Sequence, residues 1–270
     1  MQQTFSLYKI NDATFFDFCP TDYSRFKFGD GIVAEKFGTE LASKFIEQYL
    51  EANPIKNQIV VISSPYSFIP TATFTLKEYF VFTLNQWLAN NNYNVVQTSK
   101  IHRTITYKED YGELDAEQRM NLIGNDYFHI DKGFLKGKTL LFIDDIKITG
   151  SHEKMIKQMI LEHGLKNDIH FLYFAELKNK NIHPNIENYL NYFAVKSIFD
   201  LTEIINFKRF KINTRIVKYI LISDFMSFKM FLQNQNTDFI SQLYNMALGN
   251  NYHTIKEYQE NLNYIKYFYY

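Results

Sequence analysis

Cysteine is almost absent from this chain of 270 residues, which contains a single one, Cys19. One cysteine makes no disulfide within the chain and supplies too few thiolates for a sulfur-based metal site. Chains without disulfides are typical of reducing compartments, so we expect a cytoplasmic protein.

Long apolar stretches are also missing. The sequence has no run of about 18 apolar residues, the length that suggests a membrane-spanning helix. Its most apolar stretch near the C-terminus, 216–222, is interrupted by Lys218. The first residues lack the basic-then-apolar pattern of a signal peptide. We therefore expect no membrane association.

The chain has no excess charge of either sign, since 29 Lys and Arg balance 29 Asp and Glu. A neutral chain produces no overall field that attracts nucleic acid or an anionic membrane. The composition thus disfavours a nucleic-acid partner. The seven histidines also lack the close spacing of a zinc site. They are His102, His129, His152, His163, His170, His183 and His253.

One stretch, residues 139–152, combines an apolar run with polar residues of specific types. It reads Thr-Leu-Leu-Phe-Ile-Asp-Asp-Ile-Lys-Ile-Thr-Gly-Ser-His. The apolar run is typical of a buried parallel strand. A helical pattern follows from His152 to Gly164, with apolar residues on one face and glycine as a stop signal. We predict a strand, an acidic tip, a loop of small residues and a helix.

This arrangement suits a ribose that carries a 5-phosphate. Ligands of open α/β sheets bind beyond the carboxyl ends of the strands. Backbone N–H groups of the small-residue loop favour a phosphate at the start of a helix. Asp144 and Asp145 would repel that phosphate, but they can accept hydrogen bonds from sugar hydroxyls, directly or through hydrated Mg²⁺. The alternative is a buried strand that ends in two solvated acids before a helix, where acids are favoured anyway.

The stretch resembles the phosphoribosyl-pyrophosphate (PRPP) signature of the type I phosphoribosyltransferases. Leu140 to Gly150 follows that signature with its four apolar residues, two acids and small-residue turn. Three positions depart from it. Lys147 replaces an apolar residue, Ile148 replaces Thr or a catalytic Asp, and His152 replaces a hydroxyl residue that contacts the phosphate.

A second resemblance lies in residues 100–129 and is specific to the ComF-like (competence-factor-type) members of that family. Leu114 to Phe128 follows their order Leu, Arg, Asn-Leu, Gly and Phe, with one extra residue before Phe128. Residues 26–46 add a weaker match, a lysine, an aromatic residue and Gly-Asp before an amphipathic helix. Alone, this Gly-Asp is the ordinary pattern of a helix N-cap.

The resemblance implies a role for each candidate site residue. Asp144 and Asp145 would orient the ribose and bind Mg²⁺, and the loop after their strand would hold the 5-phosphate. That loop contains Ile148, Thr149, Gly150, Ser151 and His152. Ser63 and Ser64 would bind pyrophosphate in the loop after the first core strand, although this loop lacks glycine and has no Lys or Arg before Lys77. A plain turn into the next helix is the alternative for that loop.

Arg103 is implied as the group that stabilises the departing pyrophosphate. It stands before a polar loop, 104–112, that we interpret as a mobile lid with Lys108 as a second candidate. Arg119 is open between a ligand contact and a structural role, and Asn121 favours the structural role, as a helix cap.

The alternation of strands and helices predicts an α/β fold, a three-layer parallel sheet of the type I phosphoribosyltransferase kind. A hydrophobic content of 46% supports a sizeable core. We predict a main domain over 1–200 and a helical extension with three or four helices over 201–270. The expected strands are a hairpin within 4–18, then 58–62, 93–98, 139–143, 168–177 and 193–197. The expected helices before the extension are 31–52, 74–90 and 152–164, and 20–24 is expected to be a turn.

These observations favour an enzyme that binds PRPP with Mg²⁺ and transfers the phosphoribosyl group to a nitrogen acceptor, or runs the reverse reaction. Its partner would be a small-molecule substrate, and the extension could form a homodimer surface. The main alternative is a non-catalytic protein that binds a ribose phosphate or nucleotide and regulates, with a degenerate site. A third reading, a factor in DNA uptake, follows only from the family's name and gains little from a neutral chain. The sequence does not identify the acceptor.

Overall fold

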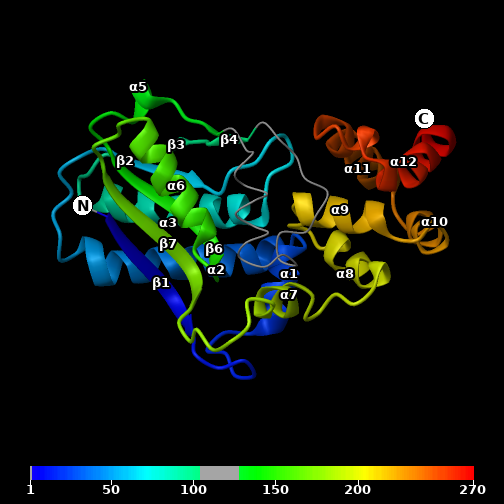
Figure 1. Ribbon diagram of the computed structural model, residues 1–270, viewed down its shortest axis with the longest axis horizontal. Coiled ribbons are helices and arrows are strands. Elements are labelled where there is room, and N and C mark those ends of the chain that lie inside the picture. The colour runs from blue at the N-terminus through cyan, green and yellow to red at the C-terminus, as the bar shows by residue number, and fades with distance from the viewer. Residues whose placement is uncertain (1, 104–127) are drawn as a thin grey trace.

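A five-stranded parallel sheet forms the centre of the protein (Figure 1). The structure is a computed structural model, and it describes residues 2–103 and 128–270. The strand order is β1-β7-β6-β2-β3. The strands are β1 (Gln2–Ile10), β2 (Ile59–Ser63), β3 (Gln97–Ser99), β6 (Thr139–Lys147) and β7 (Asp168–Leu177). A separate antiparallel pair joins β4 (His102–Arg103) to β5 (Phe128–His129).

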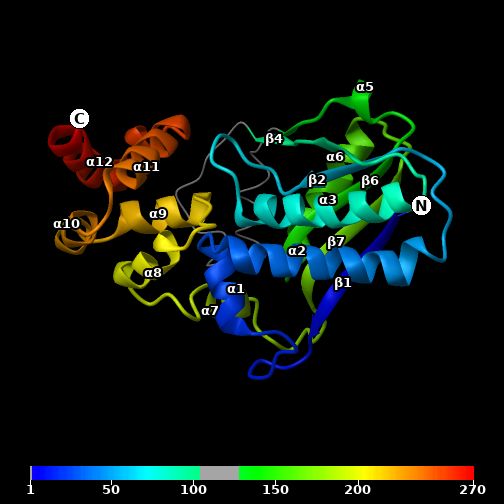
Figure 2. The ribbon, with the colours of Figure 1, turned by 180° about the vertical axis from the view of Figure 1, so that it is seen from behind.

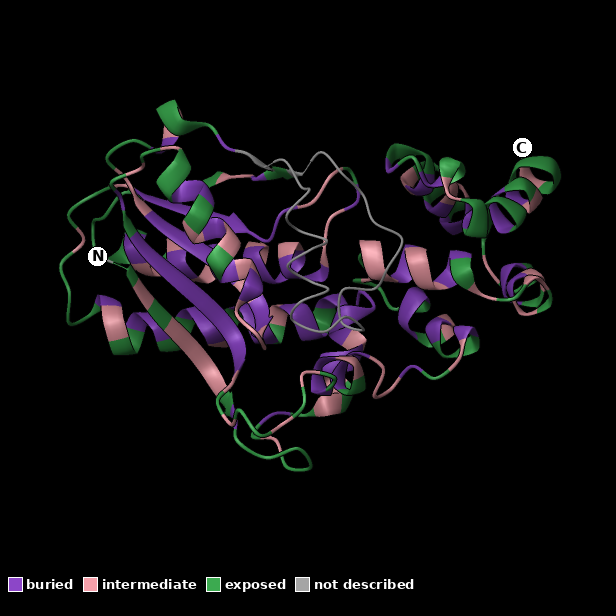
Figure 3. Ribbon diagram, viewed as in Figure 1, coloured by how far each residue is buried: buried purple, intermediate pink, exposed green. Residues whose placement is uncertain are grey.

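The middle strands are buried on both faces, as the purple arrows in Figure 3 show. All five residues of β2 are buried, and so are eight of the ten residues of β7. Strands covered on both faces are typical of parallel sheets, because their crossover helices lie on both sides. This explains why the apolar runs of β2 and β6 are continuous and do not alternate with polar residues.

Helices cover the two faces of the sheet and make three layers. One face packs on α2 (Gly31–Phe45) and α3 (Ala72–Asn90), which lie side by side across it in Figure 2. The other face packs on α6 (Ser151–Glu162), whose Ile156 and Ile160 contact Phe142 and its neighbours. The short helix α5 (Lys132–Leu135) adds Leu135 to this second cluster. The predicted three-layer α/β fold is confirmed.

The predicted N-terminal hairpin is wrong. Residues 2–10 form one strand that pairs in parallel with β7, about 170 positions further along the chain. After β1 the chain turns at Asp12, whose carboxylate accepts hydrogen bonds from Thr14 and Phe15. Phe16 and Phe18 then pack on other aromatic rings and join no strand.

Several predicted boundaries also change. The predicted turn at 20–24 is the start of helix α1 (Pro20–Lys27), where Pro20 occupies the first turn that tolerates proline. Helix α2 ends at Phe45 and continues as a π-helical turn, η1 (Ile46–Leu50). The predicted strand 93–98 overlaps β3 (Gln97–Ser99) only at residues 97 and 98.

The predicted strand at 193–197 is wrong. This segment follows α7 (Ile186–Asn191) and precedes the 3₁₀ turn η3 (Ile198–Asp200). It is fixed by Ser24 of α1, whose hydroxyl accepts a hydrogen bond from the Ala194 amide at 3.0 Å. The amides of Lys196 and Ser197 bond the Asp200 carboxylate, so side chains take the place of a neighbouring strand in the described part of the chain.

The C-terminal part is helical, as predicted, but it contains five α-helices and not three or four. They are α8 (Leu201–Asn206), α9 (Thr214–Ile222), α10 (Phe225–Gln233), α11 (Thr237–Gly249) and α12 (Lys256–Tyr269), with the 3₁₀ turn η4 (Tyr252–Thr254) between the last two. Side chains at Asn213, Asp224 and Asn236 each accept a hydrogen bond from the first turn of the following helix. These caps divide the region into short helices.

The extension has its own cluster of buried residues, and it lies at one end of the sheet in Figure 1. The cluster also takes in Phe28 and Ile69 from the first part of the chain. Within residues 2–103 and 128–270, no helix combines the length and apolar character that crossing a membrane requires. The division of the chain at residue 200 stays a prediction.

Candidate ribose-phosphate site

Asp144 and Asp145 lie within β6, which continues through Lys147 and does not end at the two acids. Successive residues of a strand point to opposite faces of a sheet. The two carboxylates accordingly lie on opposite faces of the sheet. Asp145 contacts side chains of α1 and α3, while Asp144 contacts the loop after β2 and the start of α6.

Asp145 is the centre of a closed network and is only 5% exposed. Its carboxylate forms an ion pair with Lys27 and accepts hydrogen bonds from the Tyr23 hydroxyl at 2.7 Å and the Thr73 hydroxyl at 3.1 Å. Burial alone would raise the pKa of Asp145. The charge and hydrogen bond of Lys27, with the Tyr23 hydrogen bond, outweigh burial and hold this pKa well below its usual 3.8. Asp145 is therefore a buried, ionised group.

Local structure explains why Lys27 reaches Asp145. Lys27 is the last residue of α1, and the chain then reverses at Gly29, whose φ of 97° favours glycine. Asp30 caps α2 by accepting hydrogen bonds from the Ile32 and Val33 amides. The Lys-Phe-Gly-Asp segment thus combines the ordinary helix cap with a lysine that pairs with the signature.

Asp144 faces the two loops and is more open, with 17% of its side chain exposed. It accepts a hydrogen bond from the Ser64 hydroxyl at 2.7 Å, and the Nδ1 atom of His152 lies 3.1 Å from its second oxygen. Thr73 approaches it at 3.4 Å. Asp144 is therefore the carboxylate placed between the loop after β2 and the loop after β6.

The loop after β6 has the conformation of an anion-binding turn. Gly150 is the N-cap of α6 with φ 73° and supplies no side-chain cap, while the Thr149 hydroxyl accepts a long hydrogen bond of 3.4 Å from the Ser151 amide. Free N–H groups of a first helical turn, together with the helix dipole, favour an anion. The Thr149 and Ser151 hydroxyls lie 2.8 Å apart on one side of the turn, and Ile148 packs partly against the core.

Lys147 departs from the signature for a structural reason. Its ammonium pairs with Glu153 of α6 at 2.7 Å and lies 3.5 Å from Glu176 of β7. Glu153 also pairs with Lys157 and accepts a hydrogen bond from the Tyr173 hydroxyl. Lys147 thus helps to neutralise an acid in the first turn of the helix that would otherwise oppose an anion.

The end of β2 and the loop after it bring Ser63 and Ser64 to the same edge, with Ser63 as the last residue of the strand and not part of the loop. Ser63 is level with Ile143 in the neighbouring strand, and both serines are buried. Tyr66 then forms an isolated parallel bridge with His102, which places the β4–β5 pair against this loop. The backbone of Arg103 in β4 therefore follows this contact directly, while the lid at 104–112, Lys108, Arg119 and Asn121 lie outside the described residues.

No group of three or more metal-ligating side chains occurs within residues 2–103 and 128–270. Magnesium often binds through one or two carboxylates and the phosphate oxygens of a ligand, and keeps several waters. Asp144 fits such a metal because its oxygens are partly accessible. Asp145 fits it less well, since its carboxylate is buried and already forms an ion pair with Lys27.

Three residues of the site were missed by sequence reasoning, namely Tyr23, Lys27 and Thr73. The only signal was the lysine before Gly-Asp, and it gave no partner. Tyr23 lay in a predicted turn and Thr73 just before a predicted helix, and their contacts with Asp145 follow from the packing of α1 and α3.

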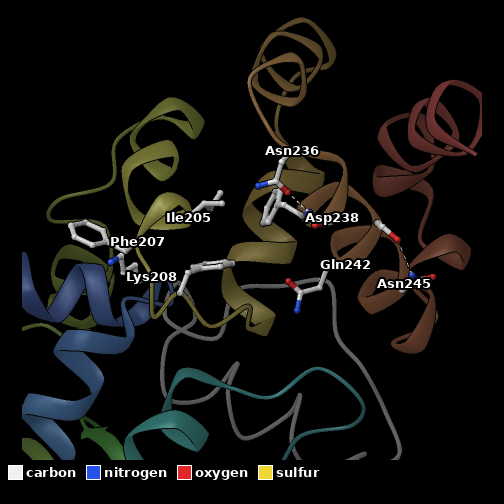
Figure 4. A pocket seen from close by; sticks show the side chains of 10 residues that line it. Ile205, Phe207, Lys208, Asn236, Asp238, Gln242 and Asn245 are labelled. Carbon is white, nitrogen blue, oxygen red and sulfur yellow. Dashed lines mark hydrogen bonds between the residues drawn. The ribbon is translucent and has the colours of Figure 1, made fainter.

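A hollow lies on the extension, between the segment after α8 and helix α11 (Figure 4). Its volume is about 550 Å³. Aromatic residues Phe207, Phe210 and Phe239 line it together with polar residues such as Lys208 and Gln242. It shares no residue with the site around Asp144.

Comparison with known proteins gives the class of this chain. Asp144 contacts the loop after β2 and the start of α6 at the carboxyl edge of the parallel sheet. Parallel α/β sheets commonly bind their ligands at this edge. The family model described as "PRTase ComF-like" matches residues 1–265. The chain therefore belongs to the ComF-like phosphoribosyltransferase family. The sequence matches no curated protein.

Solved structures with a similar arrangement include hypoxanthine phosphoribosyltransferases. One from Staphylococcus aureus is 11% identical, with a TM-score of 0.33 over 56% of this chain and 69% of that chain. The hypoxanthine-guanine enzyme of L. donovani is 13% identical, with a TM-score of 0.34 over 54% and 73%. The enzyme of Trypanosoma cruzi in complex with IMP is 16% identical, with a TM-score of 0.33 over 56% and 72%. These scores are low, so the family assignment rests on the family model.

Proposed function

We propose that this protein is a phosphoribosyltransferase that binds PRPP with Mg²⁺ and transfers the phosphoribosyl group to a nitrogen acceptor. The C1–O bond to pyrophosphate breaks and its electron pair leaves with pyrophosphate. A C1–N bond forms, and the acceptor's proton passes to solvent. One observation carries the proposal: Asp144 stands between the start of α6 and the loop after β2.

Asp144 binds the ribose hydroxyls in this proposal, and the turn from Ile148 to His152 binds the 5-phosphate. Asp145 acts mainly by fixing the end of β6 against Lys27 and Tyr23. Ser63 and Ser64 present their loop to the pyrophosphate, and Arg103 stabilises its departing charge. Mg²⁺, held through Asp144 and the substrate, would neutralise part of the diphosphate charge. Positioning and electrostatics suffice for such a reaction, so Ile148 at the position of a base is compatible with it.

A non-catalytic binding protein is the second candidate. Ile148 in place of an acid–base residue favours it, as does the commitment of Asp145 to Lys27. Cytoplasmic location and a homodimer stay predictions. Binding without turnover would separate this candidate from the enzyme.

Turnover tests the proposed function. The protein is incubated with PRPP, Mg²⁺ and a panel of nucleobases and amines, and pyrophosphate release is measured. The reverse reaction is followed from nucleotides and pyrophosphate. We expect release that depends on one acceptor, is lost in Asp144→Asn and persists in Asp168→Asn, a control at the opposite end of the sheet. Binding of PRPP with no release from any acceptor would favour the non-catalytic protein.

A further inference from the structure

Lys77 of α3 is a buried lysine without an acidic partner in the described part of the chain. It is 6% exposed, and its ammonium lies over the Phe74 ring, 4.1 Å from the centroid. Lysines are almost never fully buried unless they are paired. Burial lowers the pKa of Lys77, and the charge of the neighbouring Glu78 raises it. Within residues 2–103 and 128–270, no carboxylate pairs with this ammonium.

A second lysine, Lys100, lies on the other side of the same aromatic pair. Its ammonium donates a hydrogen bond to the Ser67 carbonyl at 2.6 Å and lies 3.8 Å from the centroid of the Tyr66 ring. The Tyr66 and Phe74 rings meet edge to face, with centroids 5.5 Å apart. Burial lowers the pKa of Lys100 as well. Two desolvated cations therefore flank one pair of rings.

This cluster adjoins the candidate site. Thr73, one helical turn before Lys77, contacts both Asp144 and Asp145. Side chains of a helix point toward its N-terminus, so the Lys77 ammonium lies over Phe74 and toward the loop after β2. Tyr66 belongs to that loop, two residues beyond the serine that bonds Asp144. The cations thus lie beside the loop after β2, the loop whose Ser64 contacts Asp144.

We propose that Lys77, with Lys100 as its companion, binds the diphosphate group of the substrate, an inference that rests on the proposed function. A phosphate at α6 and a diphosphate at the lysines would occupy the two sides of the ribose acid Asp144. Two cations match a group with several negative charges better than they match a single carboxylate. Lys77 supplies the cation that the loop after β2 lacks in its own sequence.

Lys77→Met is the decisive variant, because methionine keeps an apolar stem of similar length and removes the charge. We expect its affinities for PRPP and for inorganic pyrophosphate to fall by about 30-fold or more, since one partner of a buried charge pair is lost. Ribose 5-phosphate, which lacks the diphosphate, should bind as in the native chain. Lys100→Met, at a more open position, should show a smaller loss in the same direction.

Thermal unfolding without ligand gives the second readout. If the ligand is the missing anion, Lys77→Met should unfold at the same or a higher temperature than the native chain, because an unpaired buried charge is gone. A lysine that served only the fold would leave a less stable variant with unchanged pyrophosphate affinity, and this result would overturn the proposal. Lys44→Met, an exposed residue on α2, is the control for the loss of one positive charge.

Asp144→Asn separates this inference from the proposed function. Loss of ribose 5-phosphate binding in that variant, with pyrophosphate binding retained, would support both assignments. Pyrophosphate binding that is equal in the native chain and Lys77→Met would overturn the diphosphate site and leave the ribose-phosphate site standing. Failure of the native chain to bind any of the three probes would overturn both.

Discussion

The two sides of β6 differ at the point where the adjacent acids lie. On the side of α1 and α3, Asp145 is enclosed by Lys27, Tyr23 and Thr73 and is nearly without solvent contact. On the other side, Asp144 meets Ser64 and His152 and stays partly exposed. Two identical side chains at adjacent positions thus have a closed and a partly open environment.

The two loops beside Asp144 are also held in place in different ways. The loop after β6 is fixed locally by Gly150 and by contacts within a few residues. The loop after β2 is fixed from far along the chain. The Asn250 side chain accepts hydrogen bonds from the Phe68 and Ile69 amides, and Thr214 bonds the carbonyls of Ile69 and Pro70. The helical extension therefore supports the loop to which we assign the pyrophosphate.

Asp145→Asn should have the largest effect on stability. The change leaves Lys27 buried and unpaired, and breaking a buried pair in this way costs about 3 kcal/mol. Urea unfolding measures this loss in free energy of unfolding. Asp144→Asn is the matched variant on the open side and should lose much less. Equal losses would contradict the division of roles between the two acids.

Asn250→Ala should lower the free energy of unfolding by about 2 kcal/mol, since two backbone amides lose their acceptor. The loop after β2 should also bind pyrophosphate more weakly. Urea unfolding and calorimetry give the two values. Asn234→Ala, at an exposed helix end, is the control and should change neither value strongly. Unchanged pyrophosphate affinity in Asn250→Ala would show that the extension does not support this loop.

Gly150→Ala should cost about 1 kcal/mol, because its φ of 73° is unfavourable for a residue with a Cβ atom. The same change at Gly137, with φ 74° and open space around it, is the matched control. Both variants should lose similar stability in urea, and only Gly150→Ala should lose affinity for ribose 5-phosphate. If both kept that affinity, the turn after β6 would not be the phosphate loop.

The free energy of unfolding should depend differently on acid pH in the native chain and in Asp145→Asn. The pKa of Asp145 in the folded protein lies below its usual 3.8, so its ionised form contributes stability above that value. This contribution is lost as the pH falls below 3.8 toward the folded pKa. The stability gap between the two proteins should therefore narrow on acidification from about pH 6 to about pH 2. A gap that is constant across this range would contradict a lowered pKa.

Local patterns were sufficient to predict the centre of the fold. The apolar run of β6, the turn at Gly150 and the Asp30 cap all depend on neighbouring residues, and the structure contains each of them. The family follows from the same short motifs. Partners far apart in the chain were not predictable. β1 was misassigned because its partner β7 lies far along the sequence, and nothing near residues 4–18 identifies a parallel neighbour.

In the candidate site, too, contacts between residues far apart in the sequence could not be predicted. Asp144 and the loop of Ile148 to His152 were recognisable from the signature, but the closed network of Asp145 was not. Opposite faces of a strand follow from its geometry, yet the lysine and tyrosine that fill one face come from α1. Lys77 lies within the predicted helix 74–90, and its burial next to Phe74 distinguishes it from a surface lysine.

Calorimetric titration of PRPP, with and without Mg²⁺, tests most directly whether the open side of β6 is a ribose-phosphate site. The native chain and Asp144→Asn are compared, with Asp168→Asn as the control. The account predicts binding to the native chain and the control that depends on Mg²⁺ and is lost in Asp144→Asn. Equal binding to all three proteins, or no binding of PRPP or ribose 5-phosphate to the native chain, would contradict it.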